Sequence, residues 1–171
     1  KVLEKYFKVS RLVVSLIAPD EKAAYFKNLS LEKILARQGI AGPPSEIEKG
    51  STVFKTVLDN GIRLIVKENR SVPLVTLQAS FLGGVRFEEE AQNGINQFLA
   101  VMVTKGTEHQ SSLEIARKVE RMAGSLSGFS GYNSFGLTFT FLSQHFDEAF
   151  GLFMEVMKKP SFEAEEMEKR R

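Results

Sequence analysis

The stretch SFGLTFTF, residues 134–141, alternates between large apolar side chains and small or polar ones. The apolar set is Phe135, Leu137, Phe139 and Phe141, and the intervening set is Ser134, Gly136, Thr138 and Thr140. Successive side chains of a β-strand point to opposite faces, so this alternation predicts a strand with one buried face. Aromatic side chains at such regular intervals are expected in a hydrophobic core rather than stacked on nucleic-acid bases.

Two helices are predicted before this strand. The apolar residues of residues 94–105 recur at helical intervals, and Gly106 is expected to end that helix. Ser111 and Glu114 match a capping box at the start of the second helix, which Gly124 stops. The expected buried stripes are Ile95, Phe98, Leu99, Met102 and Val103 in the first helix, and Ile115, Ala116, Val119, Met122 and Ala123 in the second.

A third helix is predicted after the strand. Ser143 is its expected N-cap, and Pro160 ends it because proline cannot continue a helix. Residues 162–171 begin a further charged helix. The expected buried face of the third helix consists of Phe146, Ala149, Phe150, Phe153 and Met157.

Extended segments precede the helices. Residues 53–58 and 62–67 are separated by Asp59-Asn60-Gly61, and Asn-Gly between apolar runs is a strong hairpin signal. A third run, residues 74–82, follows Pro73. Three antiparallel strands in succession are expected from this pattern.

The first fifty residues differ in character. Residues 9–18 are rich in β-branched and aliphatic side chains and predict a strand, which we expect to join a sheet because an unpaired apolar strand promotes aggregation. Residues 21–50 contain one short helical pattern, residues 31–37, followed by closely spaced glycines and prolines. We interpret residues 21–50 as a linker.

This order of elements predicts an α+β fold, a mostly antiparallel β-sheet with helices packed on one face. It lacks the regular strand-helix alternation of a doubly wound nucleotide-binding fold. The net charge of +2 is spread along the chain, which disfavours nucleic-acid binding, and the absence of cysteine excludes thiolate chemistry. No apolar run approaches the roughly 20 residues that span a membrane.

Three segments together resemble the start of a domain of the pitrilysin/insulinase family of zinc metallopeptidases, which includes mitochondrial processing peptidase. They are TVLDNGIRLIVKEN (56–69), LQASFLGGVRFEEEAQNGINQFLAVMVTKGT (77–107) and GSLSGFSGYNSFGLTFTFLSQHFDEAFGLFMEV (124–156). The opening segment, residues 5–20, is similar to the closing strand of the same kind of domain. The resemblance implies that residues 1–20 close a preceding homologous domain and that residues 51–171 are the N-terminal portion of the next, truncated at its C-terminus.

Active members of the family carry the inverted zinc motif H-x-x-E-H on the first helix of the domain. Two histidines four residues apart share a face of that helix and bind the metal, while the glutamate activates the metal-bound water. The resemblance aligns these three positions with Gln97, Ala100 and Val101, between Gly94 and Lys105-Gly106-Thr107. The frame of the motif is kept and its functional groups are absent, so no catalytic, cofactor or metal residue is expected in this segment.

Helical geometry places these three positions together, and we expect them opposite the buried stripe of the helix. A metal site of another kind is disfavoured, because Gln97 offers a carbonyl oxygen but Val101 offers no ligand and a catalytic zinc needs three protein ligands. The family's third ligand is a glutamate further along the chain. Glu163, Glu165, Glu166 and Glu168 come close to its expected position.

Other candidates have plainer interpretations. His109 and His145 are expected at the surface or in caps, and Gly83-Gly84 with Arg86 and Glu88 is expected to form a strand exit rather than a phosphate cradle. The run Glu88-Glu89-Glu90 is expected in a solvated loop. Ser125, Ser127 and Ser130 have no base and acid nearby in the sequence to complete a catalytic triad.

We therefore expect a non-catalytic domain that helps to form a peptidase chamber or to hold the substrate, with zinc bound in a catalytic domain elsewhere. The expected partners are homologous domains of the same chain or of a partner subunit, and a peptide substrate, with no nucleic acid and no membrane span. The alternative is a scaffold or assembly subunit without peptidase activity anywhere in the parent protein. An intact H-x-x-E-H in a preceding domain or partner chain distinguishes the first hypothesis from the second.

Overall fold

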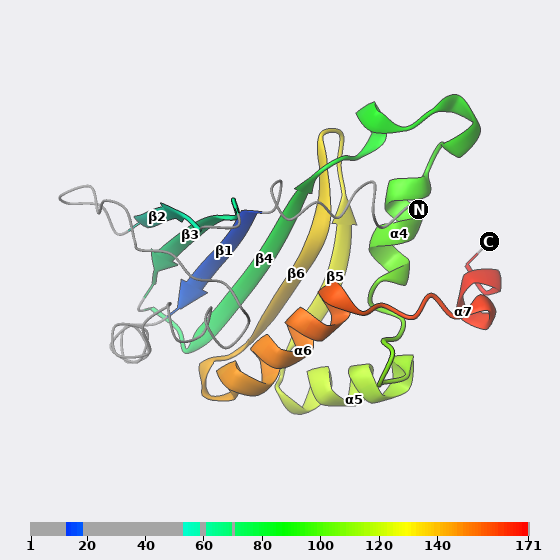
Figure 1. Ribbon diagram of the computed structural model, residues 1–171. Helices are drawn as coiled ribbons and strands as arrows, with labels where there is room; N and C mark the ends of the chain where they lie inside the picture. The colour runs from blue at the N-terminus through cyan, green and yellow to red at the C-terminus, as the bar shows by residue number, and fades with distance from the viewer. Residues whose placement is uncertain (1–12, 19–52, 59–60, 70, 171) are drawn as a thin grey trace.

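The computed structural model describes residues 13–18, 53–58, 61–69 and 71–170, and Figure 1 shows their arrangement. The predicted linker and the short helix within it lie outside these described residues. The strands are β1 (Val13–Ala18), β2 (Val53–Val57), β3 (Arg63–Glu68), β4 (Leu74–Leu82), β5 (Ser125–Ser130) and β6 (Ser134–Leu142). The helices are the 3₁₀ turns η2 (Val85–Phe87), η3 (Glu90–Gln92) and η4 (Ser143–His145), and α4 (Ile95–Met102), α5 (Ser112–Arg121), α6 (Phe146–Lys158) and α7 (Ala164–Glu168).

The strands form one sheet in the order β2-β3-β1-β4-β6-β5. All neighbouring pairs are antiparallel except β1 and β3, which run parallel. The predicted α+β class with a mostly antiparallel sheet is therefore confirmed. The 134–141 alternation corresponds to β6, in which Phe135, Phe139 and Phe141 are at most 1% exposed, so the core interpretation is correct.

The expected succession of three neighbouring antiparallel strands is only partly right. β2 and β3 pair antiparallel as the Asn-Gly signal predicted, but β3 does not pair with β4. Strand β1 lies between them, as Figure 1 shows, and confirms that the first apolar run joins a sheet. Local turn signals do not reveal a pairing with a strand that lies 34 residues upstream of β2.

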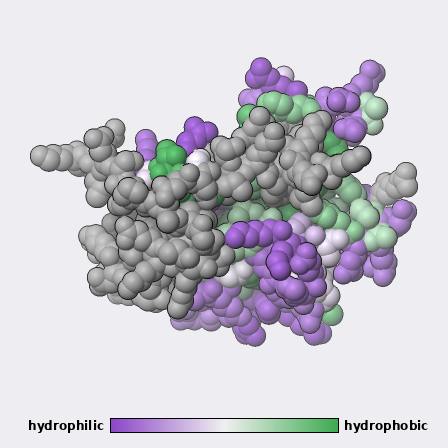
Figure 2. Space-filling view, viewed as in Figure 1, coloured by the Kyte–Doolittle hydropathy of each residue, from purple (hydrophilic) through white to green (hydrophobic). Residues whose placement is uncertain are grey.

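One face of the sheet carries the hydrophobic core. Residues of β4 and β6 pack there against apolar side chains of α4, α5 and α6. This confirms that the helices cover one face. Hydrophilic side chains gather over the outer surface of α5 and α6, at the bottom of the view in Figure 2. The most deeply buried core residues include Val75, Leu77, Ala79, Leu137, Phe139, Phe141, Ala149, Phe153 and Val156.

The opposite face of the sheet is polar along its centre. Thr76 of β4 and Thr140 of β6 are paired, and their hydroxyls lie 3.0 Å apart. Two residues further along β4, the Gln78 amide donates to the Ser80 hydroxyl at 3.2 Å. Among the described residues, the helices α4, α5 and α6 all contribute to the core on the other face, and this face carries no helix.

Helix starts follow the sequence signals in one case and not in another. The capping box of α5 is present: Ser111 N–H donates to the Glu114 carboxylate at 2.8 Å, and Glu114 N–H donates to the Ser111 hydroxyl at 3.4 Å. The predicted N-cap at Ser143 is wrong, because Ser143 begins a 3₁₀ turn and its N–H donates to the carbonyl of Pro73. In α5 the buried stripe is narrower than predicted, since Ala116 and Ala123 are exposed.

Candidate functional site

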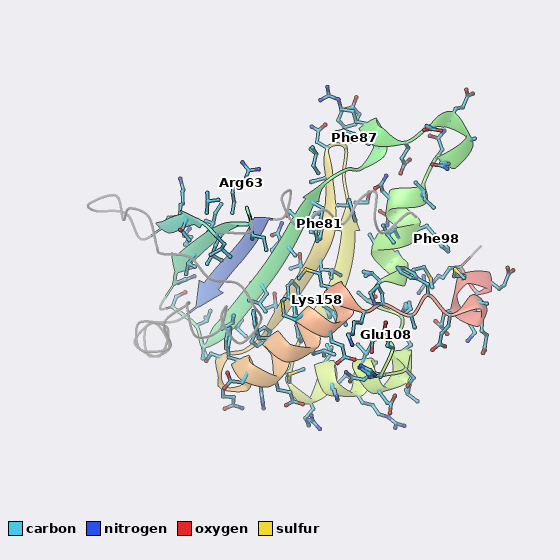
Figure 3. All side chains as sticks on the ribbon, in the orientation of Figure 1. Arg63, Phe81, Phe87, Phe98, Glu108 and Lys158 are labelled. Atoms are coloured by element: carbon cyan, nitrogen blue, oxygen red, sulfur yellow. The ribbon has the colours of Figure 1, made fainter. Side chains whose placement is uncertain are left out.

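Helix α4 carries the three positions that the sequence singled out, and they do not share one environment. Gln97 is exposed, Val101 is half-buried and Ala100 is only 1% exposed. The expectation that all three lie opposite the buried face is therefore wrong for Ala100. Figure 3 shows Phe98 on the side of α4 that faces away from the strands, and this residue is half-buried rather than buried.

Ala100 is buried because α4 lies directly against the edge strand β5. A Cβ atom added to Gly128 would lie 1.8 Å from the carbonyl oxygen of Ala100, so the two backbones meet without an intervening side chain. A glycine in a strand often marks such a close approach. Because Ala100 is only 1% exposed, a longer side chain at position 100 would have to displace the atoms around it.

The start of α4 is held by the carboxylate of Glu88. Its two oxygens accept hydrogen bonds from Gly94 N–H at 2.7 Å, from Asn96 N–H at 2.9 Å and from the Asn96 side-chain amide at 3.0 Å. The bond from Gly94 N–H, followed by those from Asn96, lowers the pKa of Glu88 below its ordinary value of 4.5. The carboxylate also lies at the positive end of the helix dipole, where negative charge is favoured. The expectation of a purely solvated acidic loop is wrong for Glu88.

Asn96 connects this cap to the sheet. Its side chain is 1% exposed, and its amide nitrogen donates to the carbonyl of Gly84 at 3.3 Å as well as to Glu88. Gly84 has φ 86°, a conformation that favours glycine, and the N–H groups of Val85 and Arg86 donate to carbonyls of the β5–β6 turn. Because these N–H groups are already bonded, Gly83-Gly84 is a strand exit and offers no phosphate cradle.

The Glu88 carboxylate is expected to stabilise the domain in a pH-dependent way. Replacing it in Glu88→Gln should cost about 1 kcal/mol of unfolding free energy at neutral pH, the usual cost of losing a helix cap. Since the folded-state pKa is below the unfolded value, this contribution is full above pH 4.5 and is lost as pH falls through the folded-state pKa. Urea unfolding of both proteins across this pH range measures it.

The control is Glu90→Gln, which removes the same charge at an exposed position two residues away. Its effect on unfolding free energy should stay within about 0.5 kcal/mol. A constant difference between wild type and Glu88→Gln from neutral pH to below the folded-state pKa would contradict the role of the ionised carboxylate.

The turn after α4 is fixed to the end of α6. Thr107 is 4% exposed and its hydroxyl donates to Glu155 at 2.6 Å, while the Gln110 amide donates to the second Glu155 oxygen at 2.6 Å. Ser161 N–H donates to the carbonyl of Gly106 at 3.1 Å. The Lys105-Gly106-Thr107 turn is therefore a structural joint between α4 and α6.

The remaining sequence candidates do not assemble into a site. His109 lies beside the ammonium of Lys159 at 3.4 Å, and His145 contacts its neighbour Gln144 at 3.1 Å. Ser127 and Ser130 lie on opposite faces of β5 because their positions differ by an odd number. Ser125 lies on the same face as Ser127.

No cluster of three histidine, cysteine or acidic side chains suited to a metal ion occurs within the described part of the chain. At the predicted motif positions, alanine and valine have no donor atom, so the residues of α4 do not fit a zinc ion. In α7, Glu165 and Glu166 instead pair with Lys169 at 3.0 and 2.9 Å, and the bond from Lys169 lowers the pKa of Glu166.

Within the described residues, no helix is both long and apolar enough to cross a membrane.

Two residues around α4 were missed in the sequence. Asn96 sits on the predicted helix among apolar neighbours, and a polar residue on a buried face is a signal of a fixed hydrogen-bond network. Gly128 lies inside strand β5, and a glycine within a strand signals a close backbone approach. The identity of its partner, the backbone of α4, required the tertiary structure.

Sequence comparison places these features in a family. The chain is 22% identical over 165 residues to a probable mitochondrial-processing peptidase subunit beta of Arabidopsis thaliana, covering 95% of this chain and 29% of that protein. It is 30% identical over 116 residues to human cytochrome b-c1 complex subunit 1, covering 68% of this chain and 24% of that protein. The chain thus spans less than a third of the length of these relatives.

A solved structure of similar fold is described as a peptidase M16 inactive domain from Pseudomonas fluorescens, with a TM-score of 0.63 and 21% identity. The match covers 70% of this chain and 29% of that one. Residues 63–171, which include α4 and the whole β4-β6-β5 half of the sheet, match the sequence profile of the insulinase family, peptidase family M16. The chain belongs to this insulinase family.

Proposed function

We propose that this chain is a non-catalytic domain that forms a chamber wall or holds substrate in a zinc metallopeptidase, whose zinc site lies in another domain or a partner subunit. The proposal is based on the residues that helix α4 carries. Its frame, Gly94 and the Lys105-Gly106-Thr107 turn, is present, whereas positions 100 and 101 offer no metal ligand and position 97 offers only an amide. Ala100 is moreover 1% exposed, so a glutamate there would have to displace the atoms around it.

Two relatives support a non-catalytic role. The domain of similar fold from Pseudomonas fluorescens is an inactive M16 domain, and another relative is a cytochrome b-c1 complex subunit. The latter also favours the second candidate function, a scaffold subunit without peptidase activity anywhere in the parent protein. The two functions differ in whether this domain contacts peptide.

The sheet supports the chamber function. One face is filled by α4, α5 and α6, and the other presents the polar row that contains Thr76, Gln78 and Thr140. A surface of hydroxyl and amide groups suits the wall of a water-filled chamber. We propose that this face of the sheet lines the chamber.

Strand β5 supports the substrate-holding function. It is the last strand of the sheet, so one of its two edges has no neighbouring strand among the described residues. An extended peptide binds such an edge by adding a strand. Gly131 N–H donates to the Ser134 carbonyl of β6. Because backbone groups of successive residues alternate in direction along an antiparallel ladder, those of residues 126, 128 and 130 point away from β6, toward the free edge.

The zinc part of the proposal is tested by metal analysis. The purified wild-type chain is expected to retain no stoichiometric zinc after dialysis and to cleave no peptide. The double variant Gln97→His/Val101→His is the positive control, because it places two imidazoles four residues apart on accessible positions of α4 and should gain measurable metal binding. One tightly bound zinc per wild-type chain would contradict the proposal.

The substrate-holding part is tested on the outer edge of β5. Ser130→Pro removes an outward N–H and should weaken the binding of a fluorescent extended peptide about fivefold, the effect of losing one hydrogen bond of about 1 kcal/mol. Proline is tolerated on edge strands, so the melting temperature should change little. Ser130→Ala keeps the N–H and is the matched control.

Equal peptide affinity of wild type and Ser130→Pro would exclude the edge of β5 as the binding element. Absence of peptide binding by the wild-type chain would favour the scaffold function. An intact H-x-x-E-H motif in the rest of the parent chain or in a partner chain would favour the peptidase function.

A further inference from the structure

Strand β1 occupies an unusual place in the sheet. It lies between β3 and β4, which are consecutive in the chain and joined by only five residues, 69–73. All six residues of β1 pair with β3, and five of them also pair with β4. The rest of the domain therefore forms a sheet with a gap one strand wide, and β1 fills it.

The gap divides the sheet into two parts. On one side are β2 and β3, and on the other are β4, β6 and β5 with the helices that cover them. Without β1, the facing edges of β3 and β4 would each present a row of unpaired backbone groups in the middle of the sheet. Buried backbone groups without partners are costly, so the gap favours any segment that supplies a strand.

The gap also specifies its occupant. The register places Val14 between Leu64 and Ala79, and Leu16 between Val66 and Leu77. Of these four neighbours, Leu64, Ala79 and Leu77 are at most 5% exposed, and Val66 packs against the core. Positions 14 and 16 thus lie in the buried rows of the sheet and require apolar residues.

The alternate rows are more permissive. Ser15 lies between Ile65 and Gln78, and these neighbours are both half-buried. The direction is also set, because the occupant runs parallel to β3 and antiparallel to β4. The gap therefore accepts one extended segment in one direction, with apolar residues at two alternating positions.

We propose that the gap between β3 and β4 is a strand-binding site and that β1 is its separable ligand, held by the pairing with both neighbours and not by its covalent link to β2. Strand β1 is joined to β2 through residues 19–52, so no tight turn sets its register, which follows the pairing with β3 and β4. By this site the segment Val13–Ala18 is joined to the part of the sheet that matches the insulinase family. The proposal does not depend on zinc, peptidase activity or substrate holding.

The placement of β1 is tested in the intact chain with introduced cysteines. The chain contains no cysteine, so two introduced thiols have only each other as partners. Ser15→Cys/Gln78→Cys joins directly paired residues of β1 and β4 and is expected to form a disulfide under mild oxidation. Ser15→Cys/Ser127→Cys is the control, because β4 and β6 lie between β1 and β5, and it should stay reduced.

The separability of β1 is tested by cutting the folded full-length chain. A specific protease site is inserted after residue 42 and cleaved without denaturant. The two fragments are expected to stay together in gel filtration, and an excess of a fluorescent synthetic peptide of residues 9–20 should exchange into the complex in equimolar amount.

The sequence requirement is tested with two variant peptides. Leu16→Asp places a charge in a buried row and should weaken incorporation by about tenfold or more, given the value of burying a leucine side chain. Ser15→Asp places the same charge in a permissive row and should bind within about threefold of the wild-type peptide.

Three results would overturn the proposal. The first is separation of the two fragments after cleavage while the larger fragment still melts cooperatively. The second is equal incorporation of the Leu16→Asp and wild-type peptides. The third is failure of the Ser15→Cys/Gln78→Cys pair to form a disulfide in the uncut chain.

Discussion

Ala100→Glu is expected to destabilise the domain by about 3 kcal/mol or more, because it forces a charged side chain into the contact between α4 and β5. Ala100 is 1% exposed, and its backbone already meets Gly128. In the predicted alignment with the family's zinc motif, the same change introduces the glutamate of that motif. The variant therefore tests whether the packing around position 100 opposes a glutamate there.

The measurement is urea unfolding at neutral pH, followed by circular dichroism. Gln97→Glu is the matched control, because it introduces the same side chain on the same helix at an exposed position and should change the unfolding free energy by no more than about 0.5 kcal/mol. Equal stability of the two variants would show that position 100 has room for a carboxylate and would weaken the proposed function.

Gly128→Ala is expected to cost about 3 kcal/mol of unfolding free energy, at the upper end of the range for overpacking. The added Cβ would lie 1.8 Å from the Ala100 carbonyl oxygen and 2.4 Å from its carbonyl carbon. These are backbone atoms of a helix that is fixed at both ends, by Glu88 at its start and by the Thr107 turn at its end. The helix must therefore move as a unit, and the contact cannot be relieved by a change of side-chain rotamer.

The control is Gly151→Ala in α6. A Cβ at Gly151 meets nothing within 4 Å, and alanine favours a helix over glycine by about 0.5–1 kcal/mol. Gly151→Ala should accordingly stabilise the protein while Gly128→Ala destabilises it, as measured by the same unfolding experiment. A loss below about 1 kcal/mol for Gly128→Ala would indicate that α4 shifts freely on β5.

The contact between Ala100 of α4 and Gly128 of β5 determines both expected results. An alanine at position 100 permits α4 to lie flat on the glycine of β5. Helix α4 is then packed directly against strand β5. Hydrogen bonds of Glu88 and Asn96 at the start of α4, and of Thr107 after its end, hold the helix in this contact.

Much of the fold was predictable from local patterns. Strand β4 begins and ends at the predicted residues, the β2–β3 hairpin follows its Asn-Gly signal, and α5 begins at its capping box. These features depend on contacts between residues close in the chain. The spacing of apolar residues and the turn-forming residues therefore predict them directly. The prediction at Ser143 failed because the β6 to α6 connection is a 3₁₀ turn bonded to Pro73, a residue 70 positions away.

The candidate site was predictable only in part. The sequence alone locates the helix, its frame and the absence of ligand side chains at Gln97, Ala100 and Val101. It did not reveal that Glu88 caps that helix from six residues before Gly94, since an acidic run in a loop is more often solvated. Nor did it separate the exposed Gln97 from the buried Ala100, because the approach of α4 to Gly128 of β5 decides which side of the helix is covered.

By itself the sequence determined the fold class and the family, since these depend on residue type and spacing along the chain, whereas the assignment of Gln97, Ala100 and Val101 to the positions of a zinc motif stays a prediction. Only the tertiary structure decided that β1 separates β3 from β4, and that Ala100 lies on Gly128. The physical reason is common to both. Strand order and helix placement are set by contacts between distant segments, and these contacts arise from the burial of whole faces, which no single segment of the chain encodes.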